Sequence, residues 1–389
     1  MKRFAAVERA LRNAAPHELL DAVRTALTRH FGAITVDLLL ADYGMTVLQP
    51  VGTPHGPRDP VPVHSSDPGR AFGAQQPCLS SDERAGTVIA HLPVSVRGDR
   101  LGVLSLTLPA GQASPDVLGV LREVCGVLGR EILVADRDTD VYLRARRAER
   151  LTLAAEMQWQ LLPGRSCSGP EYDLGAQLEP AYAVFGDNFD WSSSADYLTV
   201  TLTNGMGEGI DAALLTNLAI SALRNARRAG LDLAGQAVLA DQAVYGQHRG
   251  AAHVSVLLLR IHLATGRMEI VDAGSPRMWR LRGGTVEAVP LEAQLPLGMF
   301  EDTPYAVQHF RADPGDRLLF ASDGVYGVAS PAGERFGERA LARAMTATRL
   351  LPPSQVPQAV LTELARHRGE PPPDDDAMVL CLDWHGRKR

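Results

Sequence analysis

Acidic side chains flank three apolar segments that lie far apart in the sequence, each with the length of a buried strand. They are Asp187 and Asp190, ahead of residues 197–203; Asp323, after residues 318–322; and Asp374 and Asp375, before residues 377–382. Carboxylates at the ends of distant strands can converge where two sheets meet, and hard divalent cations such as Mg²⁺ or Mn²⁺ prefer oxygen ligands. Two such ions held close together can neutralise the charge of a phosphoryl group during an in-line displacement, so the pattern is compatible with that chemistry.

The competing interpretation of each aspartate is a turn or helix-cap residue, because Asp favours both positions. That interpretation is preferred for Asp323 or Asp374 taken alone, and the whole constellation reverses the preference. Gly205 follows the predicted strand 197–203, and a glycine there lets the backbone approach an ion and offer its carbonyl oxygen. No serine, cysteine or histidine nucleophile is evident, and the predicted chemistry needs none.

The bulk composition is that of a soluble globular protein. The chain has 389 residues, enough for two domains, with 45% hydrophobic and 22% charged residues. Its net charge of -6 argues against general nucleic-acid binding, which requires a basic surface. No apolar run approaches the roughly 18 residues that span a bilayer, and no signal peptide is evident. We therefore expect a cytoplasmic protein without nucleic acid or membrane as a partner.

Residues 1–136 are predicted to form a mixed α/β domain. The order is a helix at 17–31, a hairpin at 34–51, a Pro/Gly-rich loop at 52–77, a hairpin at 94–106 and a helix from 114. This order, with the segment LPVSVRGDRLGVLSL, resembles a GAF domain, which implies a sensor of a small molecule or a partner. Cys78, His64 and His91 could be offered as haem or metal ligands, but they are isolated, so ordinary surface or core roles are preferred.

Residues 137–163 are predicted to form a helix that connects two domains. Leu151, Ala154, Met157 and Leu161 recur in steps of three and four, as in a short coiled-coil seam. This spacing predicts a homodimer through the connecting helix. The alternative is an ordinary helix that packs on its own domain.

From residue 153 almost to the end, the chain resembles metal-dependent PPM protein serine/threonine phosphatases of the SpoIIE/RsbU type. Seven elements occur in the family order: LAAEMQWQLLP (153–163), VFGDNFD (184–190), NGMGEG (204–209), AGSP (273–276), LPLG (295–298), DG (323–324) and DDD (374–376). The resemblance implies that residues 164–389 form a PP2C-like α-β-β-α sandwich, so the fold class is an α/β sensor followed by an α+β domain. The strands expected are 197–203, 254–261, 268–271, 278–281 and 318–322, with helices at 212–229 and 357–367.

The resemblance also implies the roles of individual residues. Asp323 and Asp374 match metal ligands, Asp187 matches the acidic residue of the family's GGD motif, and Gly205 matches the glycine after the key aspartate. Asp190 and Asp375 match supporting carboxylates. Two Mn²⁺ or Mg²⁺ ions are implied as cofactors. The aspartate that bridges both ions in the family falls on Asn204.

Asn204 breaks the family pattern, because an amide has no charge and its NH₂ group repels a cation. Other departures lie nearby, namely Phe185, Glu208, Ser275 and Gly327. Glu208 or Asp211 could restore negative charge, but an acidic residue at the start of a helix more commonly stabilises the helix dipole.

Two classes of function follow. The first is a phosphatase whose substrate, by resemblance, is a phosphorylated anti-sigma-factor antagonist with a STAS fold, regulated by the GAF-like domain. The second is a pseudophosphatase that binds partners without efficient turnover. Retention of Asp187, Asp323 and Asp374 favours the first, and Asn204 favours the second. A sensor with an inert C-terminal half has little support.

Overall fold

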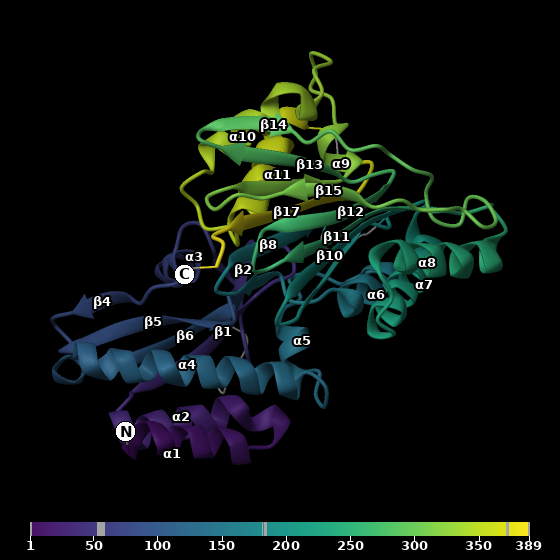
Figure 1. Ribbon diagram of the computed structural model, residues 1–389. Helices are drawn as coiled ribbons and strands as arrows, with labels where there is room; N and C mark the ends of the chain where they lie inside the picture. Colours follow the sequence, from purple (N-terminus) through teal and green to yellow (C-terminus); the bar gives the residue numbers. More distant parts are fainter. Residues whose placement is uncertain (1, 53–58, 181, 183–184, 371–372, 388–389) are drawn as a thin grey trace. The chain divides into compact units, whose positions relative to one another are not determined.

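The computed structural model describes residues 2–52, 59–180, 182, 185–370 and 373–387. Its contacts divide the chain into two compact units, Met1–Arg150 and Leu151–Arg389. In Figure 1 the first unit runs from purple to blue and the second from blue-green to yellow. No helix in the described ranges is long and apolar enough to cross a membrane.

Unit 1 is built on a six-stranded antiparallel sheet in the order β3-β2-β1-β6-β5-β4. Its strands are β1 Thr35–Ala41, β2 Val47–Pro50, β3 Val61–Pro62, β4 Cys78–Asp82, β5 Thr87–Val96 and β6 Asp99–Pro109. Its helices are α1 Lys2–Asn13, α2 Leu19–Phe31, α3 Asp67–Ala74, α4 Pro115–Ala135 and α5 Val141–Ala145, with 3-10 turns at Pro16–Glu18 and Ala110–Gln112.

The two faces of this sheet carry separate apolar cores. Val7 of α1, Leu27 of α2 and Leu128 of α4 pack with the strands on one face. Phe72 of α3 packs with Leu48 and Val103 on the other. Both predicted hairpins are present, and the second turns through Arg97 and Gly98, which both have positive φ, as a tight two-residue hairpin requires.

The Pro/Gly-rich segment 52–77 departs from the prediction of an irregular loop. It contains the short strand β3 and the helix α3. The Oγ of Ser66 accepts a hydrogen bond from the N–H of Gly69 at 3.0 Å and caps α3, while a proline occupies the first turn, where its missing N–H costs nothing. Proline therefore starts a helix here.

The connecting segment also differs from the single helix predicted over 137–163. It forms α5 and α6 (Leu153–Leu161), and residues 146–152 between them are not helical. Ala154 and Leu161 of the predicted seam are buried, and α6 packs against α7 (Gly209–Arg228) in unit 2 (Figure 1). Leu151, Ala154 and Leu161 of the predicted seam are covered within the single chain, which favours the alternative of a helix packed on its own domain, and the homodimer stays a prediction.

Unit 2 contains two antiparallel sheets. The five-stranded sheet has the order β15-β12-β11-β10-β9, and the six-stranded sheet has the order β14-β13-β16-β17-β8-β7. The strands are β7 Ser166–Ser168, β8 Tyr172–Glu179, β9 Asn188–Ser193, β10 Tyr197–Gly205, β11 Val254–His262, β12 Arg267–Ala273, β13 Arg277–Arg282, β14 Thr285–Ala288, β15 Gln308–Arg311, β16 Arg317–Ala321 and β17 Ala377–Trp384.

Helices cover one face of each sheet. The α7 helix and α8 (Leu233–His248) pack on the five-stranded sheet. The helices α10 (Leu341–Ala347) and α11 (Val356–Arg368) pack on the six-stranded sheet, near α9 (Asp323–Tyr326) and a π-helical turn at Phe336–Ala340.

The opposite face of each sheet is also buried. Leu257 on β11 and Leu380 on β17 have no exposed surface, although neither belongs to the core beneath the helices. The two sheets therefore pack on one another, which makes unit 2 an α-β-β-α sandwich. Every strand predicted for this domain is present, and only the ends differ by a few residues.

Candidate functional site

Asp187 and Asp323 come from different sheets and lie in one acidic pocket. Asp187 precedes β9 and is 2% exposed, whereas Asp323 begins α9 directly after β16. The pKa of Asp187 is raised well above its ordinary value, first by burial and then by the charges of Asp376, Asp375 and Asp323. The charges of three other carboxyl groups therefore act on Asp187, although 136 positions separate Asp187 from Asp323 in the chain.

Asp376 organises the backbone of this pocket. Its Oδ2 accepts hydrogen bonds from the N–H groups of Phe185 and Gly186, both at 2.7 Å, and of Asp187 at 3.0 Å. Burial raises its pKa to about 7 although these three bonds favour the ionised form. The sequence showed Asp376 only as the third member of an acidic run, and its position directly before β17 was the available signal.

Asp374, predicted as a metal ligand, is exposed, and its neighbours in the run occupy the pocket instead. Asp375 is half-buried, and its pKa is raised by burial, by Asp323 and by Asp374. The strand β17 begins at Ala377, which pairs with Glu179 of β8. Residues next to this pairing are held toward Asp187, whereas Asp374 lies two positions further out. Asp375 therefore joins Asp374 as a candidate ligand within the run, and the roles of both stay predictions.

Asn204 lies near the end of β10, and its side-chain NH₂ donates a hydrogen bond to Oδ1 of Asp323. The amide thus points its donor at the acidic pocket. A bridging carboxylate at this position would instead present a second negative charge to the same group.

Gly205 and Gly186 bring two backbone segments together beside Asn204. The N–H of Gly205 donates to the carbonyl of Gly186 at 3.3 Å. A Cβ on Gly186, whose φ is +150°, would lie 2.7 Å from the Gly205 carbonyl oxygen. A side chain at Gly186 would therefore separate these segments.

Two helices hold the Asp187 segment from the other side. The side-chain amide of Gln158 on α6 donates to the carbonyl of Asp187, and the hydroxyl of Thr216 on α7 donates to the carbonyl of Gly186 at 2.8 Å. Sequence analysis missed both residues, because a polar residue within a helix carries no signal of a partner 29 or 30 positions away.

Asp190 is buried but serves the scaffold. It forms ion pairs with Arg224 at 2.8 Å and Arg227 at 3.0 Å, both on α7. Arg224 also donates to the carbonyl of Leu161 on α6 at 2.6 Å. The predicted supporting role of Asp190 thus amounts to fixing α7 and α6 behind the pocket.

The positions that depart from the family pattern flank the pocket. The hydroxyl of Tyr326 on α9 donates to Oγ of Ser275 at 3.3 Å, and the Arg277 guanidinium lies 4.4 Å from the centre of the Tyr326 ring. Glu208 and Asp211 are both exposed around the start of α7. Glu208 is the N-cap residue and Asp211 lies in the first turn, and their helix-dipole role stays a prediction.

Two buried carboxylate oxygens of the pocket are suitable ligands for a hard divalent cation, but the set of ligands is incomplete. Within the described ranges, Asp187 Oδ2 and Asp376 Oδ1 are buried without a hydrogen-bond partner, which is costly unless a proton or a cation compensates them. In the same ranges, however, no three His, Cys, Asp or Glu side chains are close enough to form a metal site by themselves. Asn204 supplies an amide at the position where a further carboxylate would complete the set.

Comparisons with known proteins agree with this architecture. Residues 194–385 match the model of the family described as stage II sporulation protein E (SpoIIE). Among solved structures, the SiaA-PP2C domain of Pseudomonas aeruginosa has a TM-score of 0.50 at 23% identity, covering 59% of this chain and 94% of that one. The RsbU and RsbW domains of Rv1364c from Mycobacterium tuberculosis have a TM-score of 0.50 at 20% identity, covering 57% and 63%.

One curated relative, Protein IcfG of Synechocystis sp. (strain ATCC 27184 / PCC 6803 / Kazusa), is 21% identical over 220 residues. These residues are 49% of this chain and 35% of that protein, so the match spans about a third of the relative's length. The family model, the sandwich of two antiparallel sheets and the order of the acidic motifs all agree. Residues 194–385 form a domain of the SpoIIE family, and their fold resembles that of a solved PP2C domain.

Proposed function

We propose that unit 2 hydrolyses phosphoserine or phosphothreonine on a protein substrate, and that a reduced affinity for its cations makes this turnover slow. Asp187, Asp323 and Asp375, with the Gly205 carbonyl, are the groups that would hold Mn²⁺ or Mg²⁺. A bound divalent cation would supply positive charge for the phosphoryl group. The observation that carries the proposal is the convergence of Asp187 with Asp323, Asp375 and Asp376.

The chain's own residues orient this centre. Asp376 gathers the N–H groups of residues 185–187 and so fixes the direction of the Asp187 side chain. Gln158 and Thr216 hold the carbonyls of the same segment, so it is bound from both sides. Such preorganisation places the carboxylates before the substrate arrives.

Regulation and substrate are inferred from the family. Residues 1–136 would act as a GAF-like sensor, and the substrate would be a phosphorylated STAS-type antagonist of an anti-sigma factor. The fold of the RsbU domain matched above supports this substrate class. The homodimer through residues 137–163 stays a prediction, and its seam residues Ala154 and Leu161 are buried within unit 2.

A second function is favoured by the hydrogen bond from Asn204 to Asp323. It satisfies Asp323 without a cation, which would suit a pseudophosphatase that binds a phosphoprotein without releasing phosphate. The two functions differ in whether a carboxylate at position 204 enables turnover.

The deciding experiment measures phosphate release from a phosphoserine peptide in Mn²⁺ for the wild-type protein, Asn204→Asp and the control Asn225→Asp. The control adds the same charge at an exposed position of α7. We expect slow wild-type turnover, a gain of at least about tenfold in Asn204→Asp and no gain in the control. Fast wild-type turnover without a gain would refute the weakened site. If no variant releases phosphate, the result supports the second function, binding of a phosphoprotein without turnover.

A further inference from the structure

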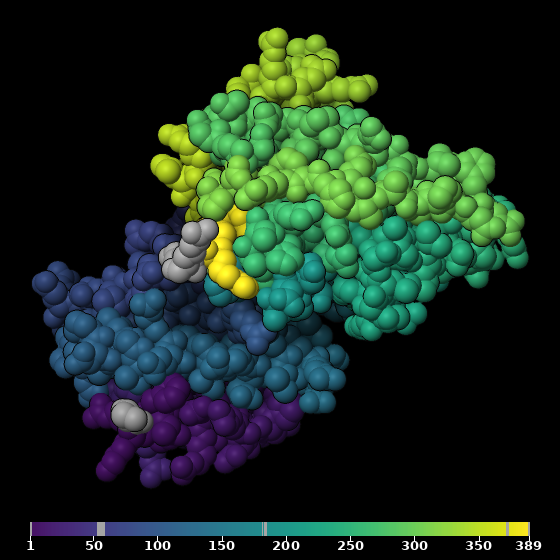
Figure 2. All heavy atoms as spheres, in the orientation of Figure 1, coloured from purple at the N-terminus to yellow at the C-terminus, as the bar shows by residue number. Residues whose placement is uncertain are grey.

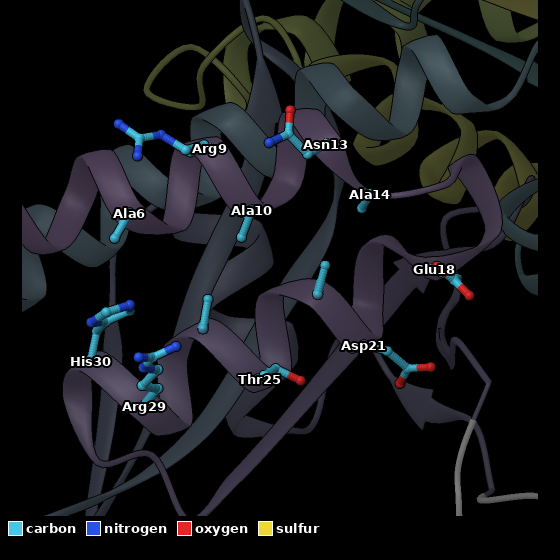
Figure 3. A pocket seen from close by; sticks show the side chains of 12 residues that line it. Ala6, Arg9, Ala10, Asn13, Ala14, Glu18, Asp21, Thr25, Arg29 and His30 are labelled. Carbon is cyan, nitrogen blue, oxygen red and sulfur yellow. The ribbon is translucent and has the colours of Figure 1, made fainter.

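A hollow of about 620 Å³ lies along α1 and α2 in unit 1. Both helices form part of the visible surface in Figure 2, and Figure 3 shows the hollow from close by. Alanines line its middle, namely Ala6 and Ala10 from α1, Ala14 directly after α1, and Ala22 and Ala26 from α2. Spacing by four residues places each set on one helix face. The core-facing residues of α1, Val7 and Leu11, lie on a different face.

The two ends of this alanine groove carry opposite charge. Arg9, Arg29 and His30 line one end, and Glu18 and Asp21 line the other (Figure 3). Within the described ranges no ion pair is formed by Arg9 or Arg29. Asp21 contacts Arg24 at 2.6 Å but remains 75% exposed, and Glu18 is 60% exposed. The groove therefore has incompletely neutralised cations at one end and accessible carboxylates at the other.

A surface with unlike ends is complementary to its own copy turned by 180°. In such an arrangement the same patch of both copies meets itself, and the basic end of each lies against the acidic end of the other. Glu18 caps the start of α2 and Arg29 lies in its last turn, about 16 Å away at 1.5 Å per residue. Small side chains along the middle let helices approach to roughly 8 Å, the short end of helix-packing distances.

We propose that the alanine groove is the contact surface between two copies of this chain, with Arg29 of each copy facing Glu18 of the other. The four helices would then form an antiparallel bundle with alanines at its centre. This inference does not depend on the phosphatase activity, and it locates self-association in α1 and α2 rather than in the segment 137–163.

Charge reversal tests the pairing. Arg29→Glu places a Glu at both contact positions, 18 and 29, and Glu18→Arg places an Arg at both. The homodimer of either variant therefore contains two repulsive contacts. An equimolar mixture restores both attractive contacts in the heterodimer. We expect each reversal to weaken dimerisation at least tenfold and the mixture to recover it, since like charges brought together are strongly unfavourable.

Sedimentation equilibrium of the full chain at roughly 1 to 100 µM measures these dissociation constants. Arg130→Glu, at an exposed position of α4 outside the groove, is the matched control and should dimerise like the wild type. Circular dichroism of each variant checks that the helices remain folded. A monomeric wild type at the highest concentration overturns the proposal. So does a dimer that neither reversal weakens, or a mixture that fails to recover.

Discussion

The side-chain amide of Asn204 donates a hydrogen bond to the carboxylate of Asp323, across 119 positions of sequence and between the two sheets of the sandwich. This bond places a donor where the phosphatase pattern calls for an anion. It stabilises the metal-free pocket, because Asp323 Oδ1 has a hydrogen-bond donor without any cation.

Asn204→Asp should lower the stability of the metal-free protein and raise its affinity for divalent cations. Two carboxylates would face each other, so the free energy of unfolding falls in the absence of divalent ions. Added Mn²⁺ should then raise the melting temperature more in the variant than in the wild type, since a ligand stabilises the state that binds it. Thermal unfolding with and without Mn²⁺ measures both effects. Equal shifts in the two proteins would show that position 204 does not limit binding.

Asp376 should be the most important acidic residue for stability in the run 374–376. Asp376→Ala leaves the N–H groups of Phe185, Gly186 and Asp187 without their acceptor, and we expect a loss of about 3 kcal/mol or more. Asp374→Ala, at the exposed position, should change stability by less than about 0.5 kcal/mol. Urea unfolding of unit 2 compares them. Similar losses would contradict the assigned roles.

Gln158 should couple α6 to the acidic pocket. Gln158→Ala removes the donor to the carbonyl of Asp187, and we expect a cost of about 1–3 kcal/mol together with a lower affinity for Mn²⁺. Gln160→Ala changes an exposed glutamine of the same helix and should leave both quantities unchanged. Calorimetric titration with Mn²⁺ gives the affinity. Unaltered binding in Gln158→Ala would reduce this contact to a purely structural role.

Asp136 should make the stability of unit 1 depend on pH. Burial raises its pKa from 3.8 to about 6 against the opposing charge of Arg146, and its Oδ1 has no hydrogen-bond partner within the described ranges. The folded state therefore holds the proton more tightly than the unfolded state. Its contribution to the free energy of unfolding falls as pH rises from about 4 to about 6.

Asp136→Asn removes this penalty and also a negative charge at the C-terminus of α4, where the helix dipole disfavours it. We expect a gain of about 1–2 kcal/mol at pH 7, discounted because the group is partly exposed, and little gain below pH 4. Amide exchange in α4 measures it, with Asp138→Asn at an exposed position as the control. A gain that does not vary with pH would contradict the titration of Asp136.

Strands and motif order were predictable because they depend on neighbours in the sequence. In residues 197–203, Leu and Val alternate with Thr, because successive side chains of a strand point to opposite faces of the sheet. The strand β10 forms there. The helix α8 was missed, since its buried positions are filled partly by the small residues Ala237 and Ala240, which leave a weak apolar stripe. The helix α3 was missed because its proline was taken as a breaker.

The choice among acidic residues depended on tertiary structure. Three adjacent aspartates look alike in the sequence, and the pairing of Ala377 with Glu179 sets which of them point toward Asp187. The pairing of Asp190 with Arg224 and Arg227 also required the packing of α7. Residue types and local periodicity select the elements, but contacts between residues far apart in the chain decide which side chains meet. In this protein such contacts give the three adjacent aspartates at 374–376 different surroundings and therefore different roles.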